Sequence, residues 1–241
     1  MARKRRRRAP RKPTGQIGHL SLDPSARTAE FVTVQFPSTK PEIEQYILDC
    51  AIENTRKTSH ALYRLTSSPI RNVESDFDFT LPTERGTQYL DLMEVKPPGG
   101  TYDAGPASYW VWDFAEAVYA QILKKSAKYG VTRRERIHLL LYSTDWRFYP
   151  DRGVFQLLTI WLGQKRHVFR TVLHYAPADQ TSGDLIRLCP TKPEERRTVD
   201  VRELRQAVIM PADFSRLQVE SGGAAVVPVS PPPPDWRPID S

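Results

Sequence analysis

Hydrophobic and polar residues alternate most clearly near the middle of this chain, and the alternation predicts a β-hairpin. Side chains of a strand point alternately to the two faces of a sheet. Residues 74 to 96 hold two apolar runs that are joined by a polar turn at residues 82 to 86. Antiparallel folding about that turn is expected to bring Asp78 of the first run beside Glu94 of the second, with Lys96 one pleat beyond.

The rest of the chain shows the periodicities of both helices and strands. Thr39 and Glu42 have the spacing of a capping box, which begins a helix, and Gly130 is a suitable end for a later helix. In chain order the patterns predict a strand at 29 to 36, a helix over about 41 to 58, a strand near 61 to 65, the hairpin, a helix from about 107 to 129, a buried strand at 137 to 143, a second hairpin with strands at 154 to 162 and 167 to 175, a loop at 176 to 198 and a short helix at 199 to 210.

This order of elements predicts an α/β fold with a mixed sheet, an added C-terminal hairpin and helix, and disordered ends. With 241 residues, of which 39% are hydrophobic, the chain can bury one sizeable core. The predicted divisions are a disordered basic arm at 1 to 28, a core at 29 to 175, an extension with a short helix at 176 to 220 and a disordered Pro-rich tail at 221 to 241, which is a candidate for binding a protein partner.

The net charge of +7 belongs to the N-terminal arm. Residues 1 to 13 contain no acid and eight basic residues, so that subtracting eight from +7 leaves −1 for the rest of the chain. The eight are Arg3, Lys4, Arg5, Arg6, Arg7, Arg8, Arg11 and Lys12. Such an arm can bind the phosphates of nucleic acid. A nuclear-localisation signal or a solubilising tail would explain it equally well.

The two carboxylates of the predicted hairpin suit a hard cation such as Mg²⁺, which prefers oxygen ligands. Such an ion can polarise a phosphate and lower the pKa of a bound water. A neighbouring lysine can position the attacking water or stabilise the charge that develops on the phosphate. Chance also produces Asp and Glu-x-Lys patterns of this length on solvated strands. Leucines on the same face as Glu94 and Lys96 favour a functional role, because buried charge is costly unless it is paired or used.

The pattern resembles the PD-(D/E)XK nuclease superfamily, in which an Asp on one strand and a Glu-x-Lys on the next hold a metal ion. Asp78, Glu94 and Lys96 match these positions, and the carbonyl of Val95 would be a backbone ligand. The resemblance implies a restriction-endonuclease-like αβββαβ core, Mg²⁺ with Mn²⁺ as a substitute, and hydrolysis of phosphodiester bonds. Glu44, in the preceding helix, matches a position that sometimes assists the metal.

The chain departs from the family pattern in two places beside the first acid. Phe77 stands where the family has proline, and Asp76 competes with Asp78 for the metal. Two distant cysteines and the lack of Cys-x-x-Cys argue against a zinc ribbon. No Gly-x-x-x-x-Gly-Lys loop or Gly-x-Ser-x-Gly is present, so neither ATP use nor an α/β-hydrolase is indicated.

The expected function is therefore that of a Mg²⁺-dependent endonuclease acting on DNA more readily than on RNA. The alternative is a non-catalytic nucleic-acid-binding or packaging protein that relies on its basic arm. A homodimer would suit cleavage of two strands, although no dimer surface can be identified from the sequence. No apolar run of about 18 residues predicts a membrane helix. The expected location is the cytoplasm or nucleoid for a bacterial or phage protein, and the nucleus for a eukaryotic or eukaryotic-virus protein.

Overall fold

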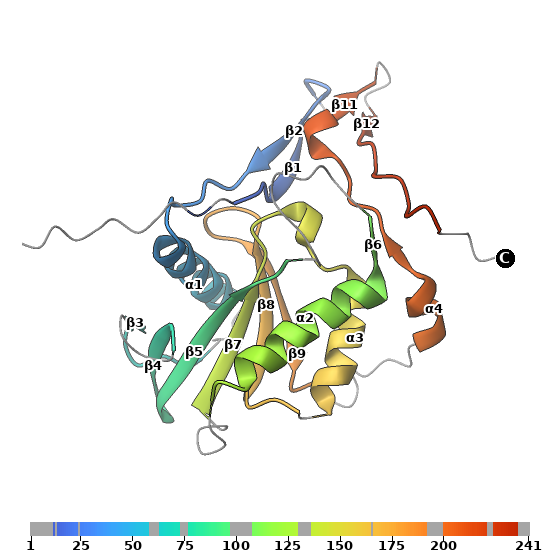
Figure 1. The fold of residues 1–241 in the computed structure, drawn as a ribbon. Helices are drawn as coiled ribbons and strands as arrows, with labels where there is room; N and C mark the ends of the chain where they lie inside the picture. Colours follow the sequence, from blue (N-terminus) through green and yellow to red (C-terminus); the bar gives the residue numbers. More distant parts are fainter. Residues whose placement is uncertain are drawn as a thin grey trace, which may run out of the picture.

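The computed structural model describes residues 12, 14–23, 25–57, 63–72, 77–96, 108–129, 136–164, 166–191, 200–220 and 224–235. Within these ranges the centre of the protein is a six-stranded mixed sheet with the strand order β3-β4-β5-β7-β8-β9 (Figure 1). Its strands are β3 (Ile70–Arg71), β4 (Phe79–Thr83), β5 (Gly86–Glu94), β7 (Ile137–Tyr142), β8 (Thr171–Pro177) and β9 (Gly183–Cys189). The protein is thus of the mixed α/β class that the sequence predicts.

The sheet has a parallel centre between antiparallel edges. β5, β7 and β8 run parallel to one another, and antiparallel strands flank them on both sides. The connections between the parallel strands contain helices, as parallel pairing requires. The carboxyl ends of β5, β7 and β8 therefore lie at one edge of the sheet, where α/β proteins commonly bind ligands.

A two-residue turn fixes the register of β4 against β5. Thr83 pairs with Gly86, and residues 84 and 85 form the turn between them. Gly86 has a φ angle of +90°, which residues with a Cβ atom rarely adopt. Counting outward from this closing pair places Phe79 opposite Leu90. Turn length thus decides which residues of the two strands face each other.

Helices cover both faces of the sheet (Figure 1). They are α1 (Lys40–Lys57), α2 (Val111–Ser126) and α3 (Arg152–Gly163). One hydrophobic cluster joins α1 to its face of the sheet, and a second joins α2 and α3 to the other face. β7 is buried on both faces, with Leu139 and Leu141 in the α2–α3 cluster and Leu140 and Tyr142 in the α1 cluster. This double burial explains the uninterrupted apolar run of β7.

The predicted capping box at the start of α1 is confirmed. The hydroxyl of Thr39 donates to the carboxylate of Glu42 at 2.8 Å, and the backbone N–H of Thr39 donates to the same oxygen at 3.1 Å. Ile43 and Ile47, one helical turn apart, are fully buried against the sheet. The cap and the apolar stripe together fix where this helix begins and which side it presents to the core.

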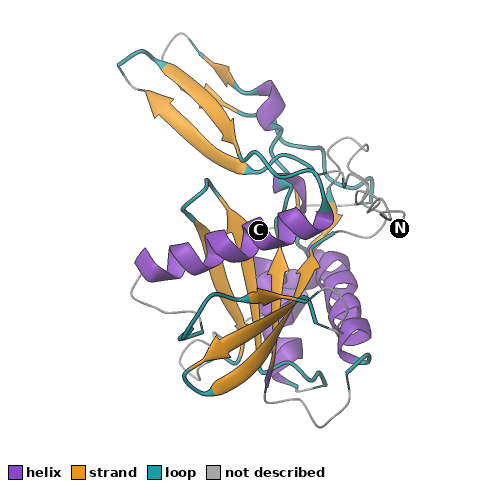
Figure 2. Ribbon diagram, turned by 90° about the vertical axis from the view of Figure 1, so that its left-hand side faces the viewer, coloured by secondary structure: helices purple, strands orange, loops and turns teal. Residues whose placement is uncertain are grey.

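Two small antiparallel sheets project together from one end of the protein (Figure 2). Phe31 of the first stacks on Phe214, which precedes the second, with ring centroids 4.5 Å apart. The remaining elements are β1 (Gly18–Asp23) paired with β2 (Thr28–Thr33), β11 (Gln218–Val219) paired with β12 (Ala225–Val226), β6 (Tyr109–Trp110) paired with β10 (Val208–Ile209), the helix α4 (Val201–Gln206) and the 3₁₀ turns η2 (Trp146–Phe148) and η4 (Phe214–Arg216).

The structure corrects the predicted boundaries at both ends of the chain. The arm expected to be disordered through residue 28 contains β1, and the tail expected to be disordered from residue 221 contains β12. Each of these strands pairs with a strand outside its predicted segment. Short, exposed strands of this kind carry little hydrophobic signal, and their pairing partners identify them.

Three predicted elements inside the chain are also wrong. The apolar run at 154 to 162 lies within α3 rather than a strand, and Asp151 caps that helix by accepting from the N–H of Val154 at 2.8 Å. The predicted loop at 176 to 198 contains β9, so the sheet extends beyond the predicted core. The first strand of the sheet, β3, lies within the stretch 61 to 72 where it is expected but later than 61 to 65; Leu65 makes one isolated bridge, and residues 61 and 62 lie outside the described residues.

The other helices are close to their predicted positions. α2 begins at Val111, later than the expected start near 107, and α4 occupies part of the predicted 199 to 210 helix before β10 follows. Among the residues that the structure describes, no helix is long and apolar enough to cross a membrane.

Candidate carboxylate site

The register of the β4–β5 hairpin brings Asp78 to Asp91 rather than to Glu94. Asp78 immediately precedes β4, and the residue after it, Phe79, lies opposite Leu90. The carboxyl groups of Asp78 and Asp91 lie within hydrogen-bonding reach of each other, and Oδ2 of Asp78 accepts from the N–H of Leu92 at 2.7 Å. The first acid of the predicted pair therefore has a carboxylate partner, three residues earlier in β5 than expected.

A lysine from α2 completes this group. Nζ of Lys125 lies 2.8 Å from Oδ1 of Asp91 and donates to the carbonyl of Leu92, also at 2.8 Å. The hydroxyl of Tyr129, just after α2, donates to the other oxygen of Asp91. A carboxylate and a backbone carbonyl thus converge on one cationic group beside Asp78.

Burial makes the two carboxyl groups titrate very differently. Asp91 is 2% exposed. Burial, followed by the hydrogen bond to Asp78, raises the pKa of Asp91 to about 7. Burial also acts to raise the pKa of Asp78, but the hydrogen bonds from Asp91 and Leu92 and the ammonium of Lys125 outweigh it and lower that pKa. Near pH 7 Asp91 is therefore about half protonated, whereas Asp78 is ionised.

Glu94 lies on the opposite face of β5, in a separate polar cluster. Its neighbours at alternate positions, Leu90 and Leu92, belong to the α1 cluster, whereas Asp91 contacts α2. Oε2 of Glu94 forms ion pairs with Lys12 at 2.8 Å and Lys96 at 3.3 Å. Its Oε1 accepts from the hydroxyl of Thr144 at 2.7 Å. Glu94 and Lys96 do lie together as predicted, but on the face away from Asp91.

Glu44 is held in ion pairs of its own. The side chain is 2% exposed and lies 3.3 Å from the ammonium of Lys40 and 3.0 Å from the guanidinium of Arg71. These contacts give its burial a structural cause, since they compensate the charge. Lys40, which pairs with Glu44, also acts on the Asp78–Asp91 group, because its positive charge helps to lower the pKa of Asp78.

Of the remaining predicted site residues, the structure describes some and leaves others undescribed. Val95 is 1% exposed and donates its N–H to the carbonyl of Tyr142 at 2.8 Å. Asp76 lies outside the described residues, as do Arg3 through Arg8 and Arg11. Lys12 is described, and its ammonium contacts Glu94 within the protein instead of being left for phosphate binding.

Two residues of the observed group, Asp91 and Lys125, were missed by sequence reasoning. Asp91 could have been noticed as a single charge inside the apolar run from Tyr89 to Met93. Counting strand positions outward from a two-residue turn at 84 and 85 would have placed Asp91 opposite Asp78. No local signal marks Lys125, because its position depends on how α2 packs on the sheet.

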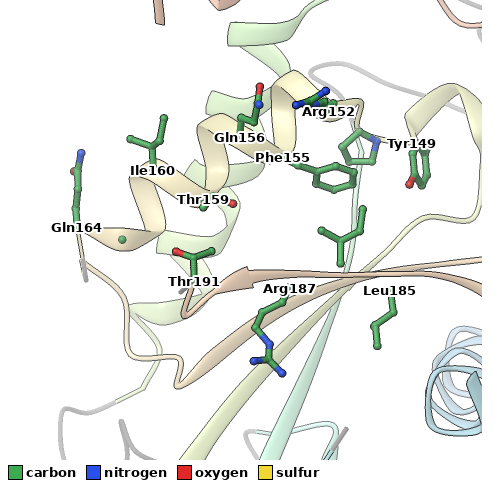
Figure 3. A pocket seen from close by; sticks show the side chains of 13 residues that line it. Tyr149, Arg152, Phe155, Gln156, Thr159, Ile160, Gln164, Leu185, Arg187 and Thr191 are labelled. Atoms are coloured by element: carbon green, nitrogen blue, oxygen red, sulfur yellow. The ribbon is translucent and has the colours of Figure 1, made fainter. Parts of the chain in front are cut away.

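A pocket of about 930 Å³ lies elsewhere, between α3 and the edge strand β9 (Figure 3). Phe155 and Thr159 of α3 line one side, and Leu185 and Arg187 of β9 line the other. No carboxylate lies among the described residues of its wall. The pocket is therefore separate from the Asp78–Asp91 group and does not supply that group with further acids.

The Asp78–Asp91 group can hold a cation and exchange a proton near neutral pH. Its oxygen donors are of the kind that Mg²⁺ prefers. The described residues contain no cluster of three or more His, Cys, Asp or Glu side chains, so a backbone carbonyl would have to contribute. No family model, curated protein or solved structure matches the chain.

Proposed function

We propose that this protein is a metal-dependent nuclease whose site is formed by Asp78, Asp91, the carbonyl of Leu92 and Lys125. One observation carries the proposal. Oδ1 of Asp91 and the carbonyl oxygen of Leu92 both lie 2.8 Å from Nζ of Lys125, and the Asp78 carboxyl group is hydrogen-bonded alongside. Oxygens arranged around one cation in this way also fit Mg²⁺ or Mn²⁺.

The order of elements supports a restriction-endonuclease-like core. α1, β3, β4, β5, α2 and β7 follow one another in the sequence, as an αβββαβ core requires, and β3, β4, β5 and β7 are neighbours in that order in the sheet. In this assignment the acidic position on the second hairpin strand is Asp91. The position two residues later, where the family pattern has lysine, holds Met93, and Lys125 from α2 takes over the positive charge.

The side chains of this group have complementary roles. Asp78, whose pKa is lowered, is ionised and attracts a divalent cation. Asp91 releases its proton near pH 7, which makes its oxygen available as a ligand. Lys125 can stabilise negative charge that builds on a phosphate. A bound Mg²⁺ would supply Lewis-acid polarisation of the phosphate and activation of water.

The alternative is a nucleic-acid-binding protein without catalysis, in which the same group is a structural ion pair. Buried carboxylates with a lysine and a tyrosine do occur for structural reasons alone. The N-terminal basic residues would then account for the whole function. The two functions differ in one measurable property, which is cleavage that depends on a divalent cation.

The direct test is incubation of purified protein with plasmid DNA, single-stranded DNA and RNA in Mg²⁺, Mn²⁺ or EDTA. We expect cleavage with the cations and none with EDTA, and we expect Asp91→Asn to abolish it. Asp113→Asn, which changes an exposed acid on the same helix as Lys125, is the matched control and should retain activity. Cleavage that survives in Asp91→Asn but is lost in Glu94→Gln would move the site to the other face of β5. Absence of cleavage under every condition would favour the binding protein.

A further inference from the structure

We propose that the pocket between α3 and β9 binds a small organic anion with a flat apolar body, such as an aromatic carboxylate or a nucleoside monophosphate. The pocket is separate from the Asp78–Asp91 group, so the proposal does not depend on the nuclease function. Its volume of about 930 Å³ is typical of sites that enclose a small molecule. Apolar rings, an arginine without an ion-pair partner and a buried imidazole together favour this ligand.

Aromatic and aliphatic side chains line the space between the helix and the strand. Figure 3 shows the ring of Phe155 between α3 and β9. Tyr149 also lines the pocket, and its ring packs edge-on against Phe155 with centroids 5.9 Å apart. From β9, Ile186 belongs to the wall and packs against the α2–α3 cluster. Such a lining suits a flat apolar body, because aromatic rings attract other rings both by stacking and edge to face.

The charge of the wall is positive. Arg152 and Arg187 line the pocket, and among the described residues neither forms an ion pair. Arg187 shares a face of β9 with Leu185, which packs against the α1 cluster, and Figure 3 shows both side chains directed away from α3. Arg152, the first residue of α3, is therefore the group that we assign to the anion.

The acids next to the wall are engaged elsewhere. Asp151 precedes Arg152 and accepts from the N–H of Val154 at 2.8 Å, as the cap of α3. Asp184, on β9, accepts from the hydroxyl of Tyr149 at 3.1 Å. Neither acid lies among the described residues of the wall. The guanidinium of Arg152 is thus left to bind a charged group of a ligand, for which its planar fork suits carboxylates and phosphates equally.

A buried imidazole lies directly behind this wall. His174 of β8 is 0% exposed and is the cross-strand partner of Ile186. Its ring centroid lies 5.0 Å from that of Phe155 and 5.5 Å from that of Tyr149. Nε2 lies 2.9 Å from Oγ of Ser143, whereas Nδ1 has no hydrogen-bond partner among the described residues. Buried polar atoms without a partner are rare, and a bound molecule is one of the groups that can satisfy them.

Matched pairs of ligands test the assignment of an anion. Naphthoate and its methyl ester share one ring system with and without the charge, as do dTMP and thymidine. Calorimetry in EDTA measures each affinity while the Asp78–Asp91 group holds no cation. We expect the anion of at least one pair to bind about 3- to 10-fold more tightly than its neutral partner, as one partly exposed charge contact allows.

Arg152→Gln should remove this preference for the anion and leave the affinity for the neutral partner unchanged. Arg202→Gln is the matched control, because Arg202 is an exposed arginine in the first turn of another helix, α4. Asp91→Asn should bind all of the ligands as the wild type does, since the pocket does not include the carboxylate group. This variant therefore separates the pocket from the proposed nuclease site.

Thr159→Trp tests whether the ligands occupy the pocket itself. Thr159 lines it from α3, so an indole there should fill the space and abolish binding of charged and neutral ligands alike. Ala120→Trp places the same side chain at an exposed position of α2 outside the wall and should bind normally. Melting curves establish that both variants are folded.

The inference would be overturned by the absence of binding for every ligand, by binding that persists in Thr159→Trp, or by an anion preference that Arg152→Gln leaves unchanged. If Thr159→Trp does not fold, the comparison of Arg152→Gln with Arg202→Gln still decides. Tighter binding of dTMP than of naphthoate would identify the ligand as a nucleotide, and the reverse order would identify it as an aromatic carboxylate.

Discussion

The side chains of Asp78 and Asp91 lie beside each other across the β4–β5 hairpin, next to the paired residues Phe79 and Leu90. Two ionised carboxylates side by side repel each other, which favours a proton on one of them. The backbone N–H of Leu92 favours charge on Asp78, which leaves the proton chiefly on Asp91. The hairpin thus contains a group whose net charge changes near neutral pH, next to the ammonium of Lys125.

Binding of Mg²⁺ should depend on this proton. Because the pKa of Asp91 is raised to about 7, the proton competes with the cation below that pH and is already released above it. We expect the affinity for Mg²⁺ to fall by roughly tenfold for each pH unit below about 7. Calorimetry from about pH 5.5 to about pH 8.5, in buffers with different ionisation enthalpies, would measure both the affinity for Mg²⁺ and the number of protons released. A flat profile would contradict the assignment of Asp91 as a ligand.

Without metal, Asp91 should also affect the pH dependence of stability. Its pKa in the folded protein is raised above the unfolded value of about 4, so its contribution to stability is present at low pH and is lost as the pH rises from about 4 to about 7. The stability of Asp91→Asn relative to wild type should therefore improve across this window, by up to about 1 kcal/mol for each pH unit. Urea denaturation of both proteins at several pH values measures the difference. A constant difference would show that Asp91 is not protonated in the folded protein.

Lys125 should matter more for cleavage than Lys96. Lys125 contacts Asp91 and Leu92, whereas Lys96 contacts Glu94 on the other face of β5. Loss of an electrostatic contact to the reacting group typically costs about 10²–10³ in rate. We expect Lys125→Met to show a loss of this size in single-turnover cleavage, and Lys96→Met a much smaller one. The opposite order would place the site around Glu94. Melting curves would confirm that both variants are folded.

Gly15 should not tolerate a side chain. A Cβ atom there would overlap Asp145, so Gly15→Ala must displace the segment of residues 12 and 14–17, here called the arm root, or shift Asp145. We expect a loss of about 1–3 kcal/mol of stability in urea denaturation, which is typical of overpacking. Gly163→Ala is the control, because a Cβ atom at Gly163 meets nothing within 4 Å and alanine favours the helix. Equal stability of Gly15→Ala and wild type would show that the arm root is not fitted to the surface as described.

Local signals were sufficient to predict several elements of the fold. The capping box at Thr39 and the buried run of β7 both depend on residues close together in the sequence, and both are confirmed. The run from Val154 to Leu162 was misassigned because an apolar segment of that length fits a buried strand or a helix. Asp151, which caps α3, was the local signal that distinguishes the two. β9 follows a polar turn and is interrupted by the charged residues Asp184 and Arg187, and its pairing with β8 identifies it as a strand.

The candidate site depended on information that is not local. The observed register, closed by the Thr83–Gly86 pair, brings Asp78 to Asp91 instead of Glu94, and a change of partner by three residues also changes the face of β5 that is involved. Lys125 enters the group from α2, 33 residues after Leu92. Periodicity indicates that α2 is a helix, but it does not predict the position at which the helix packs on the sheet. A pair of acidic residues on predicted strands therefore predicts the strands more reliably than it predicts a metal site.

The contacts of the arm root also affect how the protein can fold during synthesis. Lys12 and its partner Tyr142 are 130 residues apart in the chain, and Gln16 contacts Trp146 over a similar separation. At translation rates of about 5–20 residues per second, the arm root emerges from the ribosome roughly ten seconds before these partners. It can be seated only after β7 is complete and paired with β5. A nascent chain that stops before Tyr142 would thus leave Lys12 and Gln16 without these two partners.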